Sequence, residues 1–340
     1  MYSSDYVCGE RCQRFYLAYK MGLALILYHG LQALIFLGVN DTSDKRAALQ
    51  EGFWHIKIVV LFGITTGMLF APIWILDYLW YPTFILGIVY LLVQALFLVD
   101  LAYNWAETML ERIRKGSGKY KSLLIGSTLI LILSAIGIFS ITIWHFDQTL
   151  ERILVSINII LFVIMCVCSI LPAVQDSNPG SGIFQATLLG FYSIFLIVSA
   201  LINDPSRPKG SNFAAISSPV FGEIISVVSV IYSFLAIAKA ALSTSSNLHR
   251  LNPDWDESQE DPEKATGHYN YSLFHVGFIM ASCYTILYVT FWQYTMVKAN
   301  TIEVIDSSLA FWSRTLSSYA VDGLYLWSLF APILLVSRSF

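Results

Sequence analysis

Long, unbroken apolar runs are the feature that most constrains how this chain can fold. They lie near residues 17–39, 53–74, 80–103, 122–145, 152–173, 183–202, 219–242, 272–297 and 316–337. A helix needs roughly 20 apolar residues to cross the hydrocarbon core of a bilayer, and each run is about that long. The strands of a membrane barrel would alternate polar and apolar residues, and these runs do not. The sequence therefore predicts an all-α, polytopic transmembrane helical bundle with about nine spans.

The composition supports a membrane protein and argues against a nucleic-acid partner. Hydrophobic residues make up 56% of the chain and charged residues only 13%, whereas soluble domains are about 25% charged. A soluble domain could not bury so much apolar surface in a single core. The net charge of −3 provides no basic surface for nucleic acid, so we expect no such partner.

The polar segments divide the chain into four predicted parts. Residues 1–16 form an N-terminal segment, 17–242 contain the first seven helices, 243–271 form a loop, and 272–340 contain the last two helices. The loop is acidic and has few aliphatic residues, as is typical of a mobile connection. Its acidic residues are Asp254, Asp256, Glu257, Glu260, Asp261 and Glu263.

The distribution of Lys and Arg predicts the orientation, because cytosolic loops carry an excess of both. The densest basic cluster comprises Arg112, Arg114, Lys115, Lys119 and Lys121. If this cluster faces the cytosol, the 243–271 loop and the C-terminus do so as well, and the N-terminal segment faces a lumen or the outside. Cys8 and Cys12 lie in that N-terminal segment. An oxidising lumen would allow a disulfide between them, although the sequence leaves open whether they are bridged.

The third run predicts an unusually long helix. Nothing after Gly87 interrupts a helix from Tyr81 to about Arg114. Some 34 residues at about 1.5 Å each give about 50 Å, which exceeds the bilayer core. The helix must therefore tilt strongly or project into the cytosol.

Several polar residues of the predicted spans are candidates for a functional path. Asp100, Asn104 and Glu107 follow an i, i+4, i+7 spacing, which places them on one face of the long helix. Lys57 of the second span is a candidate partner for Asp100 or Glu107, and a pair would neutralise two charges. These groups either lock helices together or line a polar path for ions or lipid headgroups, and the sequence leaves both open.

Three further polar residues stand in otherwise apolar spans: Gln185, Glu223 and Asp322. Glu223 and Asp322 either face a cavity or pair with a group on another helix. Gln185 begins a series of polar side chains in the sixth span that could line a groove for headgroups. Ordinary helix packing explains small polar residues equally well.

We find no pattern typical of a catalytic or cofactor site. The chain has no P-loop, dinucleotide fingerprint, His-Glu-x-x-His motif or nucleophile elbow. We therefore expect a protein that is not an enzyme and that has no catalytic residues, metal site or cofactor.

Segments spread along the chain resemble one family. They read EGFWHIK at 51–57, VDLAYNWAE at 99–107, LPAVQDSNP at 171–179, YNYSLFH at 269–275 and LYLWSLFAP at 324–332. In order and rough spacing they resemble the serine incorporator family of membrane proteins. Family members are longer, with about ten spans, so the resemblance implies that the first span is missing here, either because this is a naturally shorter member or because the sequence is truncated.

The resemblance implies a fold of two helical bundles joined by a long tilted helix. It also implies either of two roles: movement of phospholipids, including phosphatidylserine, between leaflets without ATP, or supply of serine for phosphatidylserine and sphingolipid synthesis as a carrier or accessory protein. A non-transporting membrane adaptor is a third alternative. The expected partners are membrane phospholipids, serine in the second role, and a second copy in a homo-oligomer. The expected location is the endomembrane system (ER, Golgi, vacuole or endosome) or the plasma membrane.

Overall fold

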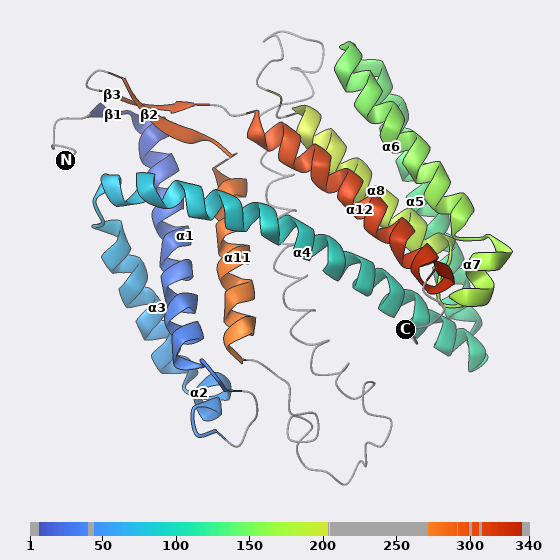
Figure 1. Cartoon of the computed structure of the whole chain (residues 1–340), viewed down its shortest axis with the longest axis horizontal. Helices are drawn as coiled ribbons and strands as arrows, with labels where there is room; N and C mark the ends of the chain where they lie inside the picture. Colours follow the sequence, from blue (N-terminus) through green and yellow to red (C-terminus); the bar gives the residue numbers. More distant parts are fainter. Residues whose placement is uncertain are drawn as a thin grey trace. The chain divides into compact units, whose positions relative to one another are not determined.

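The computed structural model describes residues 7–39, 44–202, 204, 271–290, 292–298, 301–305 and 308–334. They form helices almost throughout, which confirms the predicted all-α class (Figure 1). The predicted seventh span (219–242), almost all of the 243–271 loop, and Glu223 lie outside the described residues. The chain divides into two compact units, residues 1–90 with 226–307 and residues 91–225 with 308–340. We call them unit 1 and unit 2.

Unit 1 is built on its first helix. The helix α1 (Glu10–Ile35) packs against α3 (Trp54–Leu69) and α11 (Tyr271–Val289), and α2 (Ala47–Glu51) is a short turn between α1 and α3 (Figure 1). Gly22 allows α1 to approach α11 closely, because a Cβ at this position would overlap the Ile286 side chain. Tyr19 and Leu23 are buried with Ile286 in the same core.

A small sheet that no sequence pattern predicted completes unit 1. The strands β1 (Val7–Cys8), β2 (Tyr294–Lys298) and β3 (Thr301–Ile305) pair in the order β1-β3-β2. β1 runs parallel to β3, whereas β2 is antiparallel to β3 with Val297 opposite Ile302. The predicted span 272–297 was therefore too long. The helix ends at Val289, and Trp292, in a left-handed conformation (φ 57°), lies between it and β2.

One long helix belongs to both units, as the resemblance implied. The helix α4 (Ile73–Arg114) has 42 residues, and the division between the units falls within it, between Tyr90 and Leu91. It is longer than predicted because it starts before Pro82 and continues through it. At about 1.5 Å per residue it extends about 63 Å, roughly twice the bilayer core.

Unit 2 surrounds one central helix. Besides the second part of α4 it contains α5 (Gly118–His145), α6 (Thr149–Cys168), α7 (Pro172–Ser177), α8 (Ile183–Ile202) and α12 (Leu309–Leu334). The most apolar part of α8 is 67% buried, against 17% for α5. α8 contacts α5, α6 and α12, and its residues Ile194, Ile197 and Leu201 lie in the main apolar core.

The exposed surface of these helices is apolar. Phe62 of α3, Ile130 of α5 and Trp144 of α5 are 65–85% exposed. Side chains of this kind favour hydrocarbon over water as a solvent. In the described part of the chain, five helices are long and apolar enough to cross a membrane, and α1 and α12 also have 26 residues each. The chain is an integral membrane protein, and the count of nine spans stays a prediction.

Candidate functional site: a polar ladder in unit 2

Polar side chains connect α8 and α12 at successive levels along their contact. Arg314 Nη1 donates a hydrogen bond to the Ser199 carbonyl (3.1 Å), and Ser318 Oγ donates one to the Ser193 carbonyl (3.0 Å). Farther along, Tyr325 Oη donates one to the Gly182 carbonyl (3.2 Å). The numbers fall on α8 as they rise on α12, so the two helices run antiparallel. We call this series of contacts the polar ladder.

The middle of the ladder holds a cluster of four polar residues from three helices. Ser193 Oγ lies 2.7 Å from Ser318 Oγ and donates to Asp322 Oδ2 at 2.8 Å. Asn158 of α6 directs its Nδ2 atom to Ser193 Oγ (2.7 Å), Ser318 Oγ (3.0 Å) and Asp322 Oδ2 (3.4 Å). All four side chains are at most 1% exposed. We call Asn158, Ser193, Ser318 and Asp322 the Asp322 cluster.

The ladder continues at its other end toward α4 and α7. Tyr103 Oη lies 3.2 Å from Ser328 Oγ, and Asn178 Nδ2 donates to both Tyr103 Oη and the Ser328 carbonyl at 3.4 Å. The spacing from Arg314 to Ser328 is 14 residues, or about 21 Å along α12. Polar contacts therefore extend over much of the roughly 30 Å thickness of a bilayer core.

Unit 1 contains a separate chain of polar side chains. The Nδ1 atoms of His29 and His275 are 3.1 Å apart, so one ring donates to the other. The second ring nitrogen of His275, Nε2, lies 3.0 Å from Gln50 Oε1. Lys57 Nζ donates to the Gln50 carbonyl (2.6 Å) and lies 4.4 Å from the centre of the Trp54 ring.

An open apolar groove of about 510 Å³ runs between α1 and α11. Its walls are almost entirely aliphatic, so it can hold an acyl chain but offers little to a headgroup. The residues that line it are Ile26, Leu27, Gly30, Leu31, Ala33, Leu34, Leu37, Ser272, Val276 and Ile279.

The candidate path residues fall into different environments. Gln185 and Asp322 are each 1% exposed, but Gln185 donates to the nearby Gly180 carbonyl (2.6 Å) and is not part of the Asp322 cluster. On α4, Asp100 and Glu107 are exposed and Asn104 is half-buried. A path that contains all of these residues stays a prediction.

Lys57 has a partner that the sequence did not suggest, because its ammonium binds the Gln50 carbonyl. The expected pairing with Asp100 or Glu107 would join residues of different units, and it also stays a prediction.

Sequence reasoning missed Asn158, Ser318 and Arg314. Arg314, Ser318 and Asp322 follow an i, i+4, i+8 spacing, which places them on one helix face. That spacing was a usable signal. Asn158 stands alone in an apolar stretch of α6, and no local pattern links it to Asp322, which is 164 residues away. We find no group of three or more His, Cys, Asp or Glu side chains that could hold a metal among the described residues.

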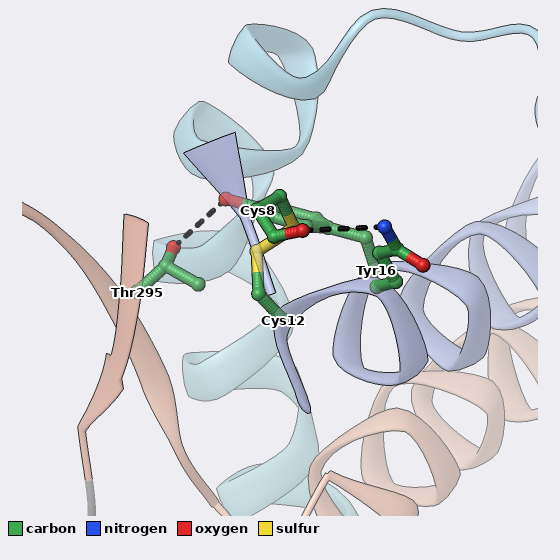
Figure 2. Close-up of a disulfide and its surroundings, with 5 residues drawn as sticks. Cys8, Cys12, Tyr16 and Thr295 are labelled. Atoms are coloured by element: carbon green, nitrogen blue, oxygen red, sulfur yellow. Dashed lines mark hydrogen bonds between the residues drawn. A yellow bond between two sulfur atoms is a disulfide. The ribbon is translucent and has the colours of Figure 1, made fainter. Parts of the chain in front are cut away.

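A disulfide joins Cys8 and Cys12 at the start of α1, with their Cα atoms 5.4 Å apart (Figure 2). Gln13 Nε2 donates to the Cys8 carbonyl (3.2 Å), and Tyr16 Oη donates to Thr295 Oγ1 of β2 (3.2 Å). The bridge therefore lies where the sheet meets the first helix. A disulfide is stable in an oxidising compartment, which agrees with the predicted lumenal side of this segment.

The apolar helices and the buried polar contacts between them define a polytopic helical membrane protein. A family model described as "Serine incorporator (Serinc)" matches residues 2–266 and 241–338. The chain belongs to the serine incorporator family, as its sequence segments suggested.

Relatives from distant organisms match nearly the whole chain. It is 29% identical to serine incorporator 3 of Mus musculus, over 96% of this chain and 80% of that protein. It is 26% identical to serine incorporator 2 of Homo sapiens (95% and 78%) and 27% identical to a membrane protein of Schizosaccharomyces pombe (95% and 79%). The names of the two mammalian relatives describe incorporators rather than enzymes.

Proposed function

We propose that this protein moves phospholipids, including phosphatidylserine, between the leaflets of a membrane without ATP. The observation that carries the proposal is the polar ladder of unit 2. A headgroup that crosses the bilayer loses its water, and each lost hydrogen bond must be replaced. The ladder offers donors and acceptors along about 21 Å of α12, and no energy source is needed for movement down a gradient.

The ladder is closed in this structure, so lipid movement requires α8 and α12 to separate. Its groups bind one another when the helices are in contact, and a headgroup would take the place of those contacts when the helices part. The outer face of α12 is apolar, with Leu316 and Trp327 more than half exposed. Acyl chains can therefore stay in lipid while the headgroup follows the ladder.

Locking α8 to α12 tests the proposal. Ser193→Cys with Ser318→Cys places two thiols where the hydroxyl oxygens are 2.7 Å apart, in a chain whose free cysteines, Cys166, Cys168 and Cys283, have been replaced. The protein is reconstituted into liposomes with fluorescent phosphatidylserine, and dithionite quenches the outer leaflet. With the oxidised variant, we expect dithionite to quench only about half of the signal. With the reduced variant, we expect it to quench nearly all of the signal.

Each single variant, Ser193→Cys or Ser318→Cys, is the matched control, and oxidant should leave it active. Full quenching in liposomes that contain the bridged protein would refute movement along the ladder. Quenching of only about half of the signal, both with the reduced protein and with the unmodified chain, would refute lipid movement altogether.

The name of the relatives, serine incorporator, favours a second candidate, a serine carrier or accessory protein for phosphatidylserine and sphingolipid synthesis. Radiolabelled serine uptake into the same liposomes tests this role. A protein that moves neither lipid nor serine would be the membrane adaptor. A location in the endomembrane system or plasma membrane, and assembly as a homo-oligomer, remain our predictions.

A further inference from the structure

Asp322 is a carboxylate buried in the middle of unit 2 whose set of partners is incomplete among the described residues. Its side chain is 1% exposed, and Oδ2 accepts from Ser193 and Asn158. Its other oxygen, Oδ1, has no hydrogen-bond partner among the described residues. A buried carboxylate that is ionised needs a compensating positive charge, above all within a membrane.

No basic side chain provides that charge in the described part of unit 2. Arg314 lies on the same helix but two turns away, about 12 Å along the axis, and its Nη1 binds the Ser199 carbonyl. The sequence of α8 has no charged residue. On α6, the buried charged residue is acidic, Glu151, which lies two turns before Asn158.

The surroundings of Asp322 are rich in oxygen. Ser193 and Ser318 place their hydroxyl oxygens 2.7 Å apart, and each hydroxyl also approaches the other residue's carbonyl, at 3.4 and 3.0 Å. Each hydroxyl has a single proton, so it cannot donate to all of these oxygens at once. Asn158 Oδ1 also lacks a hydrogen-bond partner among the described residues, although it is buried. Carboxylate, carbonyl and hydroxyl oxygens are the ligands that hard cations prefer.

We propose that the Asp322 cluster binds one sodium ion. Asp322 provides the single negative charge that balances a monovalent cation, and Ser193 and Ser318 provide neutral oxygens. A half-turn of the Asn158 amide replaces Nδ2 with Oδ1 and adds a further oxygen ligand. A divalent ion fits less well, because proteins usually hold one with several carboxylates. The site goes beyond lipid movement, because sodium binding can occur whether or not a lipid is carried.

Direct binding to the purified full-length protein tests the proposal. ²²Na⁺ binding in detergent is measured by scintillation proximity, and thermal unfolding is measured in NaCl against choline chloride at equal ionic strength. We expect saturable ²²Na⁺ binding and an unfolding temperature that rises with Na⁺. Asp322→Asn should abolish both effects, and Ser193→Ala should weaken the apparent affinity by roughly tenfold.

Asp176→Asn is the matched control, because Asp176 of α7 is an exposed carboxylate of the same unit, and this variant should bind Na⁺ like the unmodified chain. Equal Na⁺ responses in Asp322→Asn and the unmodified chain would overturn the proposal. It would also be overturned if Na⁺ had no effect and acid raised the unfolding temperature only when Asp322 was present. A proton would then be the occupant. If Asp322→Asn does not fold, Ser193→Ala decides: an unchanged Na⁺ affinity in that variant overturns the site.

Discussion

Gly190 shows how closely single residues determine packing in unit 2. A Cβ at this position of α8 would overlap the Phe162 ring of α6. We expect Gly190→Ala to lower the free energy of unfolding by about 1–3 kcal/mol, because the ring would have to move within a packed core. Chemical or thermal unfolding in detergent measures the loss. Gly137→Ala on α5 is the control, since a Cβ there meets nothing within 4 Å, and an equal loss in this variant would contradict the packing argument.

The sequence predicted individual site residues only where one side chain stood out from its own span. Asp322 stood out because a carboxylate in an apolar span is costly. Its partners Ser193 and Asn158 come from other helices, and small polar residues in a span are as common in ordinary packing. The histidine pair of unit 1 joins residues 29 and 275. No local pattern predicts such a pair, since only the packing of α1 against α11 brings the two rings together.

At the scale of elements, Arg46 holds the end of α1. Its Nη1 donates to the carbonyls of Ile35 and Leu37 (3.0 and 3.1 Å), which are near the C-terminus of the helix and lack partners within it. We expect Arg46→Ala to let this end fray and to raise amide exchange over residues 32–37 by roughly a few-fold. Lys45→Ala is the control, because Lys45 is exposed beside it. Equal protection in both variants would show that the contacts do not hold the helix end.

Arg46 also forms an ion pair with Asp44, and this pair has a defined pH dependence. The hydrogen bond from the Arg46 side chain lowers the pKa of the Asp44 carboxyl below its usual value. A lowered pKa means that the ion pair stabilises this loop at neutral pH and that the contribution is lost as the pH falls through that pKa. Because Asp44 is near the surface, we expect a small effect. Protection of residues 32–37 should fall slightly in acid in the unmodified chain and stay constant in Asp44→Asn.

The sequence predicted the helices better than their ends. Long apolar runs identified α1, α3, α4, α5, α6, α8, α11 and α12, because apolar length is a strong local signal. The prediction failed after Val289, where the helix ends, Trp292 adopts a left-handed conformation and β2 pairs with β3. That sheet depends on pairing between residues near 7 and near 301. Two-residue strands such as β1 have no recognisable sequence pattern.

At the scale of the whole molecule, the predicted orientation can be tested by glycosylation in a eukaryotic cell. Tyr2→Asn creates the acceptor Asn-Ser-Ser in the N-terminal segment, which we predict to face the lumen, as the Cys8–Cys12 disulfide also suggests. We expect a glycosidase-sensitive increase in mass. Lys264→Asn creates Asn-Ala-Thr in the predicted cytosolic loop and should stay unmodified. Modification of Lys264→Asn alone would reverse the orientation.

The parallel pairing of β1 with β3 has a consequence for biosynthesis. Unit 1 is assembled from the beginning of the chain and from residues 226–307. The ribosome therefore synthesises α1 long before α11, the helix against which α1 packs. During that interval β1 lacks its partner strand, and the face of α1 that carries Gly22 lacks the helix α11 that it packs against. A chain released early would keep these surfaces exposed, and membrane quality control can recognise a nascent chain by such surfaces.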